Sequence, residues 1–123
     1  MNEFENIKTF EDACQVLGIS SATPVVTAPD EFSVATEAYR KLLIIAKALR
    51  GNWKPDWSDY GQRKWFAWFD VVPSGFGFST AHCDYTYTRT DVGSRLCFPT
   101  HEMAEYFGEQ FIDLHRIVLT LPQ

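Results

Sequence analysis

The sequence has few of the residues that mark metal, redox or disulfide sites. Three cysteines, Cys14, Cys83 and Cys97, are spread over 123 residues, and no two of them stand in a CxxC spacing. An odd number of widely spaced cysteines does not indicate a disulfide framework. We therefore expect free, mostly buried thiols, as in proteins of the reducing cytoplasm.

Long apolar runs are also missing. The longest aliphatic run, Leu42 to Ala46, is far shorter than the roughly 20 residues of a membrane-spanning helix. The first ten residues, MNEFENIKTF, contain acids and lack the apolar segment of a signal peptide. These absences predict a cytoplasmic protein with no membrane partner.

Positive charge is scarce as well. The chain has 11 Lys and Arg against 16 Asp and Glu, a net charge of −5. Phosphate-driven binding of nucleic acids needs clustered Lys and Arg. The charge therefore disfavours a nucleic-acid partner, although a local basic patch stays possible, and it suits a protein that meets other proteins.

Aromatic residues are what the sequence has in quantity, at 15% of the chain. They concentrate in Arg63–Phe78, RKWFAWFDVVPSGFGF, where Pro73-Ser74-Gly75 interrupts the apolar run as a hairpin loop would. We predict two paired strands that form the centre of a single domain spanning residues 1–123. A chain of this length can bury a sufficient core without a metal or a disulfide.

Both faces of the predicted hairpin are apolar. In the first strand, Trp65, Phe69 and Val71 alternate with Phe66, Trp68 and Val72. In the second strand, alternation places Phe76, Phe78, Thr80 and His82 on one face. A sheet that is wet on one side would alternate apolar and polar residues. The sheet is therefore either covered on both faces or exposes aromatic side chains to a partner.

The fold class that we predict is α+β. Apolar residues spaced three and four apart predict helices over about residues 30–50 and 101–119. A short N-terminal helix, Phe10 to Leu17, would follow the cap Thr9, and residues 1–28 are expected to be loosely attached. Ser94 to Phe98 reads as a third strand. The prediction is a three-stranded antiparallel meander packed against the two main helices.

No catalytic residue, metal or cofactor is predicted. Cys97 and His101 are four residues apart, but His82 and Cys83 are successive residues of a strand and point to opposite faces, so the four cannot surround one zinc ion unless the strand has a bulge. Cysteines within apolar strands are usually inert. The acids Asp70 and Asp84 read as solvated surface groups.

The candidate binding surface consists of large side chains in polar surroundings. Trp53, Trp57 and Tyr60 lie in the loop Asn52–Gln62, which either folds over the core as a lid or acts as a recognition loop. Further along, Tyr85, Tyr87 and Arg89 would project from one face of an extended segment. Such residues anchor protein interfaces, and in other proteins they stack single-stranded bases.

Several motifs resemble a known family. The runs NWKPDWSDYGQRKWFAWFD, SGFGFS, VGSRLCF and EMAEYFGEQFIDL, within about residues 35–115, resemble a family of small proteins from bacterial and phage or prophage genomes that has no established activity. The resemblance implies a phage or mobile-element origin, and with it a possible place in a virion. It implies no catalytic residue.

Three hypotheses follow from the sequence. The leading one is a non-enzymatic protein-interaction domain, either a small virion component or an accessory protein, with an unidentified protein or a second copy as partner. The second is a single-stranded nucleic-acid-binding module. The third is an enzyme whose site carries no recognisable motif.

Overall fold

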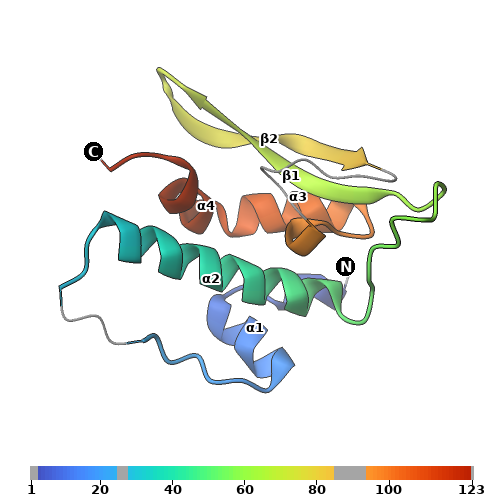
Figure 1. Ribbon diagram of the computed structural model, residues 1–123, viewed down its shortest axis with the longest axis horizontal. Coiled ribbons are helices and arrows are strands. Elements are labelled where there is room, and N and C mark those ends of the chain that lie inside the picture. The colour runs from blue at the N-terminus through green and yellow to red at the C-terminus, as the bar shows by residue number, and fades with distance from the viewer. Residues whose placement is uncertain (1–2, 25–27, 85–93, 123) are drawn as a thin grey trace.

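The computed structural model describes residues 3–24, 28–84 and 94–122, and it has an α+β fold, as predicted (Figure 1). The elements are the 3-10 helix η1 (Glu3–Asn6), α1 (Phe10–Leu17), α2 (Glu31–Arg50), β1 (Lys64–Val72), β2 (Gly75–Asp84), the 3-10 helix η2 (Ser94–Leu96), α3 (His101–Gln110) and α4 (Ile112–Leu119). No helix among the described residues is long and apolar enough to cross a membrane.

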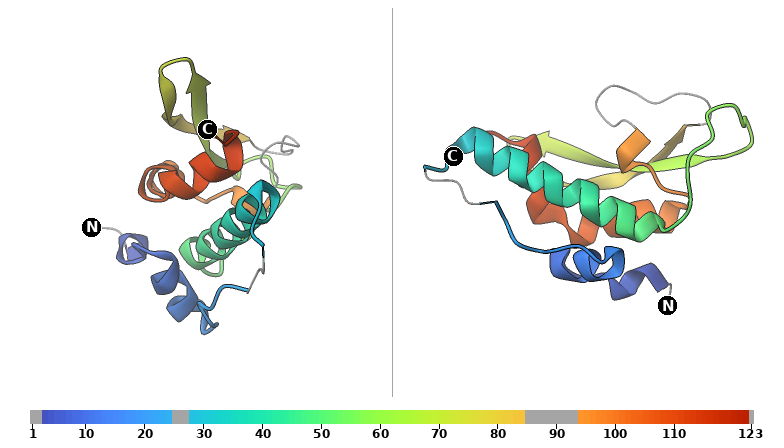
Figure 2. Two further views of the ribbon diagram at one scale, coloured as in Figure 1. Left: turned by 90° about the vertical axis from the view of Figure 1, so that its left-hand side faces the viewer. Right: turned by 60° about the horizontal axis from the view of Figure 1, so that its bottom comes forward.

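The elements form successive layers. The β1–β2 hairpin lies on top in Figure 1, α3 and α4 run beneath it, α2 follows, and α1 is outermost. Figure 2 shows the same order from two other directions, with the hairpin projecting beyond the helices at one end. The core therefore lies mainly between α2 and the α3–α4 pair, and the hairpin covers that pair from the other side.

The first helix follows its sequence signals closely. The hydroxyl of Thr9 accepts a hydrogen bond from the amide of Asp12 at 3.1 Å, and the Asp12 carboxylate accepts one from the amide of Thr9 at 3.2 Å. Gly18 ends the helix with a φ of 70°, which favours glycine. Phe10, Ala13 and Cys14 are buried against the rest of the core, so the predicted bounds of this helix are confirmed.

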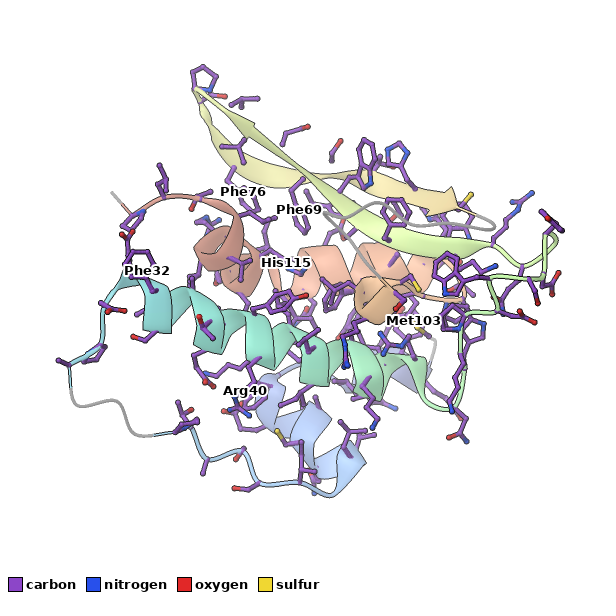
Figure 3. All side chains as sticks on the ribbon, viewed as in Figure 1. Phe32, Arg40, Phe69, Phe76, Met103 and His115 are labelled. Carbon is purple, nitrogen blue, oxygen red and sulfur yellow. The ribbon has the colours of Figure 1, made fainter. Side chains whose placement is uncertain are left out.

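The long helix α2 is confirmed too, but only part of its predicted apolar stripe is buried. Asp30 caps it by accepting from the amide of Ser33 at 2.8 Å. Leu42, Ala46 and Leu49 are buried, whereas Phe32 is 71% exposed. The first two turns of α2 therefore extend past the core, as Figure 3 shows for Phe32.

The hairpin has a bulge that the alternation pattern did not predict. Trp68 pairs with Thr80 and the next residue, Phe69, pairs with Phe78, so Ser79 is the extra residue. A bulge shifts the facing of every side chain beyond it. The prediction that Phe78 and His82 share a face is therefore wrong: Phe78 faces α3, and His82 stacks on Trp68 on the opposite face.

The prediction of a third strand over Ser94–Phe98 is also wrong. Ser94–Leu96 is a 3-10 helix, and only Phe98 pairs with β1, through two hydrogen bonds with Trp65 of 2.8 and 2.6 Å. The 3-10 helix before Phe98 and the start of α3 at His101 leave too short an extended segment for a longer ladder. The sheet formed by the described residues is thus two-stranded. The segment Tyr85–Thr90 lies outside the described residues.

The last helix is broken where one continuous helix was predicted. Thr100 caps α3 as expected, by accepting from the amide of Met103 at 3.1 Å, but Phe111 has φ −110° and ψ 31° and separates α3 from α4. The ring of Phe111 is buried against Tyr106 and Phe107. The break lets α4 turn toward the tip of the hairpin (Figure 1).

The hairpin packs on α3 at Gly108. A Cβ at Gly108 would lie 2.5 Å from Cδ1 of Phe78 and 3.0 Å from the Cβ of Ala67. Real Cβ atoms do not approach a ring carbon so closely, so any larger residue would push the hairpin away from the helix.

We therefore predict that Gly108→Ala lowers the free energy of unfolding by about 1–2 kcal/mol, since overpacking outweighs the gain in helix propensity. Urea unfolding followed by circular dichroism measures it. The control is Gly77→Ala, because a Cβ at Gly77 meets nothing within 4 Å. A Gly108→Ala variant as stable as the parent would show that the hairpin is not packed against this position.

Candidate functional site

A fully buried lysine organises the loop before the hairpin. Lys64 Nζ donates hydrogen bonds to the carbonyls of Asp56, Asp59 and Gln62 at 2.6, 3.2 and 3.0 Å. The ring of Trp57 lies 5.1 Å from the same nitrogen. A buried ammonium is stable only when its donors are satisfied. The loop thus takes its shape from the amine that it encloses.

The structure places the predicted binding residues in different environments. Trp53 and Trp57 are half-buried, and Trp57 covers Lys64, in agreement with a lid more than with a free recognition loop. Tyr60 is 78% exposed at the tip of the same loop. Tyr85, Tyr87 and Arg89 lie outside the described residues, so the binding role of the whole set stays a prediction.

The outer face of the hairpin carries a small aromatic group. Phe66 is buried, and the ring of His82 lies 6.5 Å from it and 3.9 Å from the ring of Trp68. Trp65 lies on the inner face, and the centroid of its ring is 5.2 Å from that of His101, with the two rings nearly perpendicular. Of the two sheet faces, the inner one is covered by helices, and the outer one leaves Trp68 partly exposed.

The largest concentration of exposed apolar side chains lies elsewhere, at the end of the molecule where the hairpin tip, the start of α2 and the C-terminal tail come together (Figure 1). We call it the apolar end. Its exposed members are Phe32, Val34, Val71, Val72, Ile117, Leu119 and Leu121. Phe32 and Leu121 are the most exposed of these residues, at 71% and 83%.

The apolar end is continuous across two depressions of about 610 and 660 Å³. One lies between α2 and α4, the other between the hairpin tip and the C-terminal tail, and both are lined by Arg116, Thr120 and Leu121. Arg116 donates to Asp113 at 2.6 Å, and its guanidinium lies 5.8 Å from the ring of Phe76. The sequence showed the apolar stripe of α2 but indicated that it packs on the core, so neither the exposure of Phe32 nor its continuation through the tail was expected.

A separate small cavity lies inside the fold, between α2, β1 and α4. His115 on its wall is 5% exposed and is flanked by the rings of Phe69 at 4.4 Å and Phe107 at 4.7 Å (Figure 3). Nδ1 of His115 lies 2.9 Å from the carbonyl of Phe111. Burial lowers the pKa of the imidazole from 6.5 to about 4, so the ring is neutral at ordinary pH.

The cysteines and the other histidines are held in separate environments. Cys97 is buried, its Sγ donates to the carbonyl of Ser94 at 3.2 Å, and burial raises the pKa of its thiol to about 11. His101 packs on Trp65 and lies 3.6 Å from a carboxylate oxygen of Glu105. Within residues 3–24, 28–84 and 94–122, no group of three or more His, Cys, Asp or Glu side chains is arranged to hold a metal ion.

Comparison with known proteins identifies no relative: no family model matches the chain, and no curated protein or solved structure matches it. The function is therefore inferred from the surfaces and the cavity of the molecule. The resemblance to the phage and prophage family stays a proposal.

Removal of the Lys64 ammonium tests the role assigned to it. We predict that Lys64→Met lowers the free energy of unfolding by about 2–3 kcal/mol, because three carbonyls lose a charged donor. Urea unfolding monitored by tryptophan fluorescence measures the change. Lys54→Met, which removes an exposed lysine from the same loop, is the control, and equal effects of the two substitutions would contradict the structural role.

The buried imidazole predicts a pH dependence. The pKa of His115 is lower in the folded protein than in the unfolded chain, so the unfolded chain binds the extra proton first as the pH falls. The free energy of unfolding is therefore highest above about pH 6.5 and falls by about 3 kcal/mol as the pH approaches 4. His115→Phe should flatten this slope in chemical denaturation between pH 7 and pH 4.

Val118→Ala provides the matched control for the pH experiment. It shortens another side chain on the same cavity wall, so it should lower the free energy of unfolding at every pH and leave the dependence of that free energy on pH unchanged. If His115→Phe kept the parent slope as well, the proton uptake would have to come from another group.

Proposed function

We propose that this protein is a non-enzymatic interaction domain of phage or mobile-element origin, and that it associates with a second copy of itself through the apolar end. The observation that carries the proposal is the concentration of seven exposed apolar side chains on three segments that are distant in the sequence. Contiguous apolar patches of this kind mark interaction surfaces in soluble domains.

The size of the surface supports a protein partner. More than twenty described residues line the two depressions of the apolar end and the neighbouring depression between α2, α4 and Pro24. One side of a standard protein interface has roughly 20–30 residues. A partner that covered this end would bury Phe32 and Leu121, the two most exposed apolar side chains there.

The charges at the apolar end favour a second copy as the partner. Asp30 and Glu31 lie beside Phe32, and Arg116 lies on the other side of the same depression. In a two-fold interface the same surface meets itself, so the acids of one copy face Arg116 of the other. The Arg116–Asp113 pair is exposed and contributes little, so its exchange for an intermolecular pair costs little.

The charged groups at this surface also support a role without catalysis. Asp30 caps α2 through Ser33, and Arg116 is paired with Asp113. These groups are held by local structure and do not converge on one point. The resemblance to the phage and prophage family supports a small virion component or an accessory protein.

Sedimentation velocity over a range of protein concentrations tests the proposal. We expect a monomer–dimer equilibrium in the micromolar range or tighter. Phe32→Glu and Leu121→Glu should each weaken it by about tenfold or more, because each places a charge in the buried centre of the interface. Neither should change the free energy of unfolding of the monomer by more than about 0.5 kcal/mol.

The matched control is Val16→Glu. Val16 is 60% exposed, but it lies on α1 and does not belong to the apolar end, so this variant should dimerise like the parent. A parent protein that stays monomeric at millimolar concentration, or an equal loss of dimer in all three variants, would contradict the proposal.

A further inference from the structure

The cavity between α2, β1 and α4 differs from the surface depressions in size and lining. It has a volume of about 100 Å³, and Leu42, Phe69, Phe107 and Val118 form much of its wall. A cavity of about 150 Å³ with a wall of this kind holds one benzene molecule. The space here is about two thirds of that volume, so a ligand of one six-membered ring fits only if part of it extends toward the surface.

The wall carries one deeply buried basic atom. A carbonyl oxygen can only accept a hydrogen bond, so Nδ1 of His115 is the nitrogen that donates to Phe111. Nε2 is then an unprotonated acceptor on the opposite side of the ring. Among the described residues, no donor lies within hydrogen-bonding distance of it. A buried acceptor without a donor costs about 1–3 kcal/mol, which a suitable ligand would recover.

Water is a poor occupant of this site. A buried water molecule needs two to four polar partners, and His115 and Tyr39 supply at most two, the minimum, since the other described side chains on the wall are apolar. An anion is unfavourable as well, because no Lys or Arg is among these residues. The wall thus selects a neutral molecule with an apolar body and one hydrogen-bond donor.

The cavity can be reached from the surface. Tyr39 and Leu119 belong to its wall and are both exposed, so its mouth opens between α2 and the end of α4. The aromatic rings of Phe69 and Phe107 on either side of the imidazole favour an aromatic ligand, since ring pairs contribute beyond their buried area.

We propose that this cavity binds a small neutral aromatic alcohol of the phenol class, whose O–H donates to Nε2 of His115 and whose ring packs against Phe69 and Phe107. The neutral state of the imidazole keeps Nε2 available as an acceptor across the ordinary pH range. The ligand site shares Leu119 with the apolar end, but it does not require the protein to dimerise.

The experiment compares phenol with toluene, which has the same size and lacks the donor. Each is titrated into the full chain by calorimetry, and the side-chain nitrogen resonances of His115 are followed by NMR. We expect phenol to bind with a dissociation constant of about 0.1–1 mM. Phenol, but not toluene, should shift the Nε2 resonance, a readout that needs no substitution.

Two variants locate the site. In His115→Phe, the ratio of phenol affinity to toluene affinity should fall about tenfold, because the acceptor is lost and the aromatic contacts are kept. In Val118→Phe, the larger side chain fills the cavity, and binding of both probes should be lost. Leu121→Glu should bind phenol like the parent at a protein concentration at which the parent is monomeric, which separates this test from the test of dimerisation.

Three results would overturn the proposal. The first is no binding of phenol to the parent at any concentration that leaves it folded. The second is phenol binding that leaves the Nε2 resonance in place. The third is an unchanged phenol-to-toluene ratio in folded His115→Phe, which would mean that the probe sits elsewhere or makes no hydrogen bond to the imidazole.

Discussion

The contact between the hairpin and α3 at Gly108 is the constraint on which the rest of the structure depends. A two-stranded sheet is marginal in water by itself, and Phe98 adds only one bridge to its edge. The hairpin is therefore stable only if its inner face is buried on helices. The ring of Phe78 occupies the space that a side chain at position 108 would need, and this close approach brings the inner face onto α3.

The bulge at Ser79 decides which aromatic residues take part in that contact. It places Phe78 and Phe76 on the face of Phe69, so three phenylalanines point toward α3 and α4. It also releases His82 to the outer face, where it stacks on Trp68. Phe69 then meets His115, and the cavity forms where these rings do not fill the space between β1 and α2.

The parts of the fold that were predictable are those determined by local chemistry. The caps Thr9, Asp30 and Thr100 and the terminator Gly18 all act within four residues, and their helices begin or end as expected. No proline marks the break at Phe111 in the sequence, because the break arises from the burial of the Phe111 ring. The strand predicted over Ser94–Phe98 is replaced by a 3-10 helix over Ser94–Leu96, so Phe98 is the residue of this segment that pairs with β1.

The site residues were less predictable for a related reason. A lysine is expected at the surface, and nothing local shows that three carbonyls of one loop converge on Lys64. The apolar end joins residues about 90 positions apart, so it exists only after folding. His115 did leave a signal: it stands four residues after Phe111 and eight after Phe107, on the apolar face of the helix.

The two proposed sites meet at Leu119. This side chain belongs to the wall of the small cavity and also to the depression at the hairpin tip. A second copy seated on the apolar end would therefore cover or displace a residue at the mouth of the cavity. Coupling between two binding events is reciprocal, so a ligand that altered the position of Leu119 would change the affinity between copies by the same factor. The end of α4 is thus the element through which ligand binding and association would influence each other.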